Sequence, residues 1–110
     1  MKIKNVQGEF TKAEVFNMTQ GGTVAKISEH AGEVLELGGW ILYEDENTEG
    51  CTQEVLALKE KNGLISATIS PTFIKQFKKA LEFMGDEAFN IKVVTGTSKS
   101  NRTYVTCELV

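Results

Sequence analysis

Residues 70–85 have the sequence SPTFIKQFKKALEFMG, and they contain the clearest helix signal in the chain. Ser70 is a favourable N-cap, and Pro71, the only proline, suits the first helical position. Gly85 predicts where the helix ends. The apolar residues fall at helical spacing on one face, namely Phe73, Ile74, Phe77, Leu81 and Met84. The stretch therefore predicts one long amphipathic helix.

Strand-like segments flank this helix on both sides. Three of them precede it, at residues 33–44, 51–60 and 64–69, and two follow it, at residues 89–95 and 102–109. Asn62-Gly63 predicts a tight hairpin between the second and third strands. Gly38-Gly39 lowers strand propensity inside the first strand and predicts a bulge or a sharp bend. Small barrels need such a bend where one strand serves both halves of the sheet.

The order strand, strand, strand, helix, strand, strand is that of the OB-fold, a five-stranded Greek-key barrel. We therefore predict a β-rich, OB-fold-like five-stranded barrel over residues 33–110, with its helix between strands three and four. An open α+β sheet has the same order of elements and is the alternative.

Residues 1–32 are expected to form an N-terminal extension of this single domain. Residues 1–10 predict a short strand, and Thr11 with Glu14 forms a capping-box pattern before a short helix over residues 12–18. Gly21-Gly22 predicts the end of that helix, and residues 23–32 fit either a turn of helix or an irregular segment.

Composition indicates an ordinary globular domain, since 41% of the 110 residues are apolar and 25% are charged. No apolar run approaches the roughly 20 residues needed to span a membrane, and residues 1–5 lack the pattern of a secretory signal, so we expect a cytoplasmic protein. Cys51, Cys107 and His30 are too few for a zinc site, so we expect no metal and no cofactor.

Charge is spread unevenly along the chain. Residues 1–57 carry four Lys and ten acidic residues, a net charge of −6, whereas residues 58–110 carry eight Lys or Arg and five acidic residues, a net charge of +3. The overall charge of −3 argues against a polyanionic partner, but a local basic patch is enough to bind a phosphate backbone. No nucleophile–base pattern accompanies these charges, so we do not expect an enzyme.

The segment joining the last two strands, residues 95–104, has the most informative composition. Lys99 and Arg102 could neutralise phosphates, Tyr104 lies on the outward face where a base could stack, and Ser98 adds a hydroxyl. In an OB-fold this loop takes part in oligonucleotide binding. Composition alone also fits, and favours, an ordinary polar hairpin loop.

Two further groups are candidate nucleic-acid contacts. Trp40 and Tyr43 have opposite parity in the first strand, so one should face the core and the other solvent. The predicted helix carries a basic cluster, for which a solvated helix face is the simpler interpretation. This cluster consists of Lys75, Lys78 and Lys79.

Three stretches resemble small single-stranded DNA-binding proteins encoded by phages and mobile elements of Gram-positive bacteria. These stretches are LYED at 42–45, SPTFI at 70–74 and GTSKSNRTYVTC at 96–107. The resemblance extends over about residues 33–110, although Asn101 stands where similar sequences often have Gly. It implies an OB-like fold, single-stranded DNA binding during replication or recombination, and Lys99, Arg102 and Tyr104 in the binding surface. Replication or recombination proteins would be further partners, and we expect a homo-oligomer, a dimer or larger.

The acidic loop after the first strand counts against DNA binding, because it would repel phosphate if it flanked the groove. It contains Glu44, Asp45, Glu46 and Glu49. The competing hypothesis is a small protein-binding adaptor that uses this acidic hairpin or an exposed strand edge.

Overall fold

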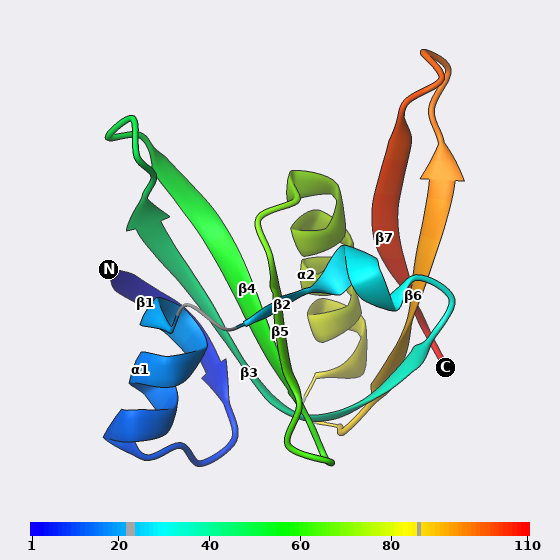
Figure 1. Ribbon diagram of the computed structural model, residues 1–110. Coiled ribbons are helices and arrows are strands. Elements are labelled where there is room, and N and C mark those ends of the chain that lie inside the picture. Colours follow the sequence, from blue (N-terminus) through cyan, green and yellow to red (C-terminus); the bar gives the residue numbers. More distant parts are fainter. Residues whose placement is uncertain (22–23, 86) are drawn as a thin grey trace.

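A strongly curled seven-stranded sheet and two α-helices make up the described part of the chain (Figure 1). The computed structural model describes residues 1–21, 24–85 and 87–110. The elements in chain order are β1 (Lys2–Gln7), α1 (Lys12–Gln20), β2 (Ala25–Lys26), the 3₁₀ helix η1 (Ile27–His30), β3 (Val34–Glu46), β4 (Thr52–Glu60), β5 (Ile65–Thr68), α2 (Pro71–Met84), β6 (Asn90–Thr97) and β7 (Thr103–Leu109). Over these ranges, no helix combines the length and the apolar character needed to cross a membrane.

The long strand β3 joins the two halves of the sheet. Its stretch from Leu37 onward pairs with β4, whereas its first residues, Val34–Glu36, pair with β6. The register shifts between Leu37 and Gly39, so the bulge predicted at this glycine pair is confirmed. Gly39 also allows a close approach of the chain, since a Cβ there would lie 2.6 Å from the carbonyl oxygen of Gln7. The bend therefore lets one strand serve both halves.

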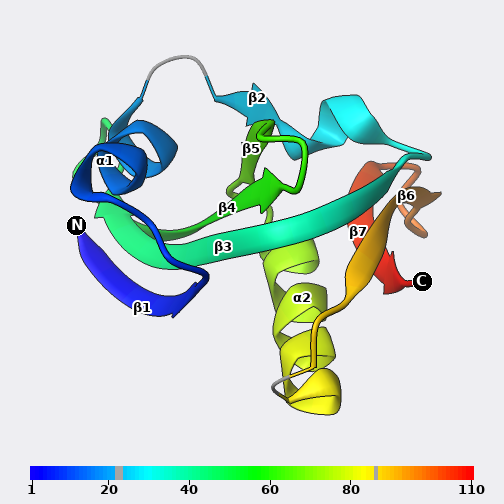
Figure 2. The same cartoon turned by 90° about the horizontal axis from the view of Figure 1, so that it is seen from below.

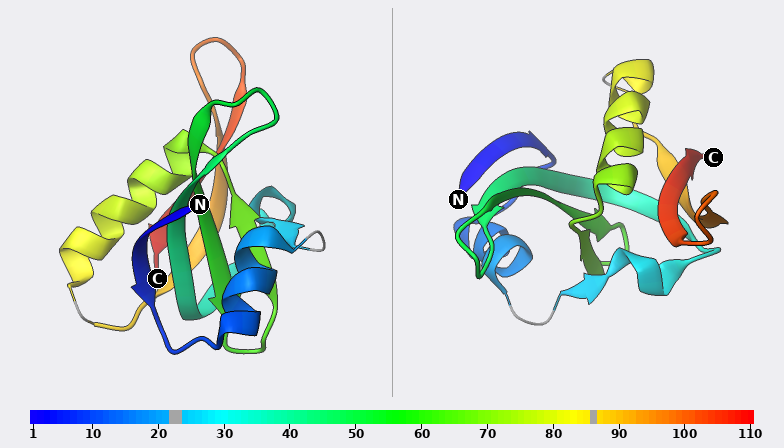
Figure 3. Two further views of the ribbon diagram at one scale, coloured as in Figure 1. Left: turned by 90° about the vertical axis from the view of Figure 1, so that its left-hand side faces the viewer. Right: turned by 90° about the horizontal axis from the view of Figure 1, so that it is seen from above.

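The sheet curls into a half-barrel whose strand path runs β2-β5-β4-β3-β6-β7, with β1 added to β3. The predicted β-rich, barrel-like architecture, with a long helix between the third and fourth of the strands after residue 33, is confirmed. The β3–β4 and β6–β7 hairpins project from the same end of the molecule (Figures 1 and 3). In the view from below, α2 and the β2–η1 segment lie on opposite sides of β3 (Figure 2).

Helix α2 follows its sequence signals closely. The Ser70 hydroxyl accepts a hydrogen bond from the Phe73 N–H at 3.3 Å, and Pro71 occupies the first turn. Gly85 ends the helix with φ of 61°, and its N–H donates to the carbonyl oxygen of Leu81. The buried face contains Phe73, Ile74, Phe77 and Ala80.

Both faces of β3 and β4 are buried, in two separate clusters. The larger cluster lies under α2, where Trp40 packs edge-to-face on Phe77 with ring centroids 5.3 Å apart. The smaller cluster lies under α1, where Met18 is 1% exposed. Successive residues alternate between the clusters, so Leu42 joins the first and Tyr43 the second.

The N-terminal elements pair or pack with the rest of the described chain, since β1 pairs with β3 and α1 contributes Met18 to the second cluster. The predicted capping box is present, because Thr11 and Glu14 exchange side-chain-to-backbone hydrogen bonds, but the helix extends to Gln20 rather than 18. Gly21 is its C-cap, while the prediction for Gly22 lies outside the described residues. The segment that the sequence left ambiguous contains a two-residue strand, β2, which pairs in parallel with β5.

The two cysteines are expected to differ sharply in reactivity. Cys107 is 2% exposed, and burial raises the pKa of its thiol to about 11, whereas Cys51 is exposed. Because the thiolate is the reactive form, Ellman's reagent at pH 8 should modify one thiol quickly and the second only in urea. A Cys51→Ser variant should lose the fast thiol. Two fast thiols in the folded wild type would contradict the burial of Cys107.

Candidate nucleic-acid interface

The tip of the β6–β7 hairpin is a closed turn, and Lys99 and Arg102 lie in it. The Ser98 N–H donates to the Arg102 carbonyl oxygen at 2.9 Å, and the Asn101 N–H donates to the Ser98 carbonyl oxygen at 3.0 Å. The Ser98 hydroxyl accepts from the Arg102 N–H at 3.2 Å and lies 3.0 Å from the Ser100 hydroxyl. Ser98 therefore organises the turn, and its role is in positioning the loop.

Asn101 adopts the left-handed conformation that this turn requires. Its φ is 61°, and it is the only non-glycine residue with positive φ in the described part of the chain. Asn tolerates this region better than most residues, and Gly adopts it freely. A glycine at this position could adopt the same left-handed conformation, so Asn101 does not indicate a different turn.

Tyr104 lies across Gly96 on the neighbouring strand. The two residues are direct partners in the β6–β7 register, and a Cβ on Gly96 would lie 2.4 Å from the Tyr104 hydroxyl oxygen. The aromatic ring therefore rests on the strand at the one place where no side chain blocks it. Tyr104 nevertheless remains 40% exposed, so its ring keeps accessible surface.

Lys99 and Arg102 carry positive charge that no described residue neutralises. Both are exposed, and neither forms an ion pair with any residue in the ranges that the structure describes. Arg102 directly precedes β7, and Tyr104 is the second residue of that strand. The structure thus brings together four sequence-predicted residues, Ser98, Lys99, Arg102 and Tyr104.

The acidic β3–β4 hairpin is compensated in part inside the molecule, since Lys4 and Lys78 pair with two of its carboxylates. Lys4 Nζ lies 3.3 Å from Glu44 and 3.1 Å from Glu54, and Lys78 Nζ lies 2.7 Å from Glu54. The hydrogen bond from Lys78, together with that from Lys4, holds the pKa of the Glu54 carboxyl below its ordinary value. A hydrogen bond from Gln20, followed by the Glu46 N–H, also lowers the pKa of Asp45.

The basic cluster on α2 is smaller than the sequence suggested. Lys78, one of the three predicted contacts on this helix, is half-buried and paired with Glu54, so its charge is already offset within the molecule. The partner lies 24 residues away in the sequence, on β4. Lys75 and Lys79 are exposed, and Lys79 lines a shallow groove between α2 and β7, away from the hairpin tip.

The prediction that either Trp40 or Tyr43 faces solvent is wrong. Their side chains do point to opposite faces of β3, as the parity indicated, but each face is covered. Trp40 is 7% exposed, and its indole N–H donates to Asn5 at 3.1 Å. Tyr43 is 4% exposed and its hydroxyl donates to the Thr19 carbonyl oxygen, while burial, and then Asp45, raises its pKa. Neither ring is available to stack on a base.

Gly96 is the site residue that the sequence interpretation passed over. A glycine inside a strand commonly marks a close approach of another group, and this was the signal that could have identified it. The described residues contain no group of three or more His, Cys, Asp or Glu that could hold a metal ion.

In comparisons with known proteins, no family model, no curated protein and no solved structure matches this chain.

Proposed function

We propose that this protein binds single-stranded DNA without marked sequence preference, through the tip and outward face of its β6–β7 hairpin. The observation that carries the proposal is that Lys99 and Arg102, both exposed and in no ion pair with a described residue, lie in the same hairpin as Tyr104, which is 40% exposed. Cations that follow the backbone and an aromatic platform for bases are the two parts of sequence-tolerant recognition.

The half-barrel supports this proposal as a variant of the OB-fold. From β3 onward the element order is that of an OB-fold, and β3 pairs with both β4 and β6. In this interpretation the short β2–η1 segment lies along β5 at the side where the strand path is open. The β6–β7 hairpin then corresponds to the loop between strands four and five, which contributes to oligonucleotide binding in OB-folds.

Ion pairs within the molecule offset part of the negative charge that counts against DNA binding. Glu44 and Glu54 are bound to Lys4 and Lys78, so their charges are offset before DNA approaches. The adaptor alternative keeps support from Glu46 and Glu49, which are exposed near the tip of that hairpin. Capture of a specific protein partner, without DNA binding at low salt, would favour the adaptor.

Titration of the protein into fluorescently labelled oligo-dT, followed by anisotropy, tests the proposal. The label is placed on DNA because Trp40 is buried and its emission would report binding poorly. We expect sub-micromolar affinity at low salt, steep weakening as salt rises, and similar affinities for oligo-dC. Absence of binding at low salt would reject the DNA-binding function.

Gly96→Ala is expected to weaken DNA binding with little loss of stability. The new Cβ would displace the Tyr104 ring, which is the far end of a flexible side chain and can move away. Affinity for oligo-dT should therefore fall about as far as in Tyr104→Ala, by about 1–3 kcal/mol per stacked base. Urea denaturation should distinguish this local change from unfolding. Full affinity in Gly96→Ala would show that the Tyr104 platform is not used.

A further inference from the structure

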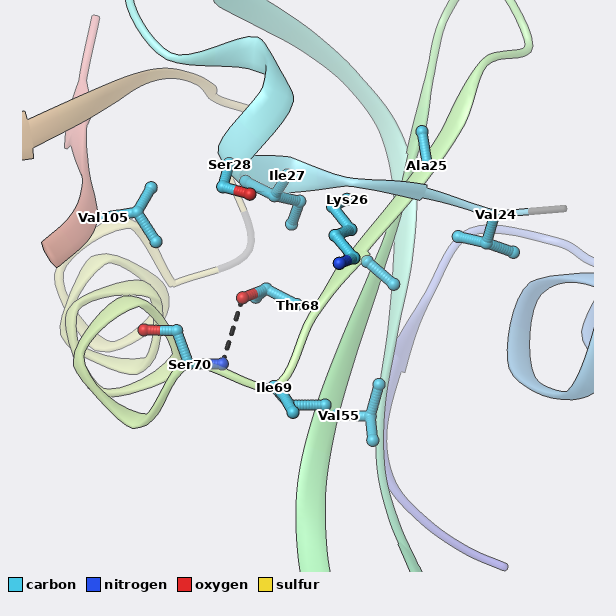
Figure 4. Close-up of a pocket in the computed structure, with 11 residues that line it drawn as sticks. Val24, Ala25, Lys26, Ile27, Ser28, Val55, Thr68, Ile69, Ser70 and Val105 are labelled. Carbon is cyan, nitrogen blue, oxygen red and sulfur yellow. Dashed lines mark hydrogen bonds between the residues drawn. The ribbon is translucent and has the colours of Figure 1, made fainter. Parts of the chain in front are cut away.

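A cavity lies at the open side of the half-barrel, between the β2–η1 segment and the start of α2. Its volume is about 460 Å³, and β7 contributes Val105 to its wall (Figure 4). The opposite walls come from β2, η1 and the β5–α2 connection. No sequence pattern indicated this cavity, because its walls come from segments far apart in the chain.

The lining combines apolar walls with a few hydrogen-bond donors. The apolar part includes Val24, Val55, Ile69 and Val105, and Ile69 is 58% exposed even though it is a large aliphatic residue. Figure 4 shows the Lys26 ammonium pointing toward the centre of the cavity. A concave apolar site with few polar groups is the usual form of a pocket for a small organic group.

Hydroxyl groups at the α2 end of the cavity are available as donors. Thr68 Oγ1 accepts a hydrogen bond from the Ser70 N–H at 3.0 Å, and Ser70 Oγ accepts from the Phe73 N–H. Each hydroxyl therefore still has its own hydrogen to donate. A planar ring with apolar faces and carbonyl oxygens on its edge matches this lining, because its faces meet the aliphatic walls and its edge meets the donors.

The cavity is also close to the proposed phosphate contacts. Val105 follows Arg102 by three residues of extended strand, which is about 10 Å. β7 is the last strand of the sheet path and its neighbouring residues face opposite sides, so a DNA chain that crosses β7 near Tyr104 can reach both the Tyr104 face and the Val105 face. Lys26 would supply a further positive charge at the cavity.

We propose that this cavity receives a nucleobase of the bound single strand, with Ile69 and Val105 against the ring and Lys26, Thr68 and Ser70 as donors to its polar edge. This inference rests on the proposed DNA-binding function and extends it from the hairpin to the open side of the half-barrel. A strand that places one base on Tyr104 and another in the cavity would be held at both faces of β7.

Ile69→Ser and Leu64→Ser form a matched pair of variants for this proposal. Both residues flank β5 and are almost equally exposed, at 58% and 57%, but only Ile69 lines the cavity. The probes are oligo-dT and an abasic oligodeoxyribonucleotide of the same length, which carries the same phosphates without bases. Ile69→Ser should weaken oligo-dT binding at least about fivefold and leave abasic binding unchanged, since it removes a contact with the base alone. Leu64→Ser should change neither.

The outcomes separate the two proposals. If the wild type binds oligo-dT but Ile69→Ser binds it as tightly as Leu64→Ser does, the cavity proposal is wrong and the DNA-binding function stands. Equal weakening on both oligomers would also reject the cavity, because a base pocket cannot matter to an abasic chain. If the wild type binds no oligomer at low salt, the DNA-binding function fails and the cavity proposal fails with it. Urea denaturation of each variant checks that the fold is retained.

Discussion

The double variant Lys99→Ala/Arg102→Ala is expected to reduce the salt dependence of oligo-dT binding. Each phosphate contact on a single strand contributes about 0.7 to the slope of log K against log salt, so loss of two contacts should flatten the slope by about 1.4. Affinity at low salt should fall as well, because both side chains are exposed and are not held by ion pairs with described residues. Anisotropy titrations at several salt concentrations measure both quantities.

Lys12→Ala/Lys61→Ala is the matched control for charge. It also removes two positive charges, both from exposed positions. Lys61 lies in the β4–β5 turn, at the end of the sheet opposite the β6–β7 tip (Figure 1). If the effect comes from net charge alone, both double variants will weaken binding equally. An unchanged slope in Lys99→Ala/Arg102→Ala would remove the hairpin tip from the binding site.

Phe77→Ala is expected to lower the free energy of unfolding by about 3–5 kcal/mol, the usual cost of truncating a large buried aromatic residue. Phe77 is 1% exposed and lies between two other rings, with centroids 5.3 Å from Trp40 and 5.8 Å from Phe89. Truncation would leave a cavity at the contact between α2 and β3. Urea denaturation followed by circular dichroism gives the change.

Phe83→Ala is the control on the same helix. Phe83 is 83% exposed, so its truncation should change the free energy of unfolding by less than about 0.5 kcal/mol. Equal losses in the two variants would mean that α2 does not bury the face containing Phe77. A normal Phe77→Ala midpoint would contradict the aromatic cluster directly.

Local signals in the sequence determined the helices, the turns and the bend. Ser70 and Pro71 mark the start of α2 and Gly85 marks its end, because capping interactions act within one helical turn. The glycine pair in β3 predicted a bulge because glycine weakens strand pairing wherever it stands. The grouping of Lys99, Arg102 and Tyr104 was also predictable, since they lie within six residues of one hairpin.

Contacts between distant segments decided the rest. Parity correctly assigned Trp40 and Tyr43 to opposite faces of β3, but it could not show that α1 covers the second face. The ion pair between Lys78 and Glu54 depends on how α2 packs beside β4. The placement of Tyr104 over Gly96 likewise depends on the register of β6 and β7.

The sequence by itself thus determined the long helix, the strands after residue 33 and the turns between them, and which short loop contains two cations close to an aromatic residue. Only the tertiary structure decided which of those charges stay free, which aromatic rings stay exposed, and that a cavity opens between β2, the β5–α2 connection and β7. The physical reason is range: caps, periodicity and turn conformations act between residues a few positions apart, whereas burial and ion pairing depend on which distant segments the packed fold brings together.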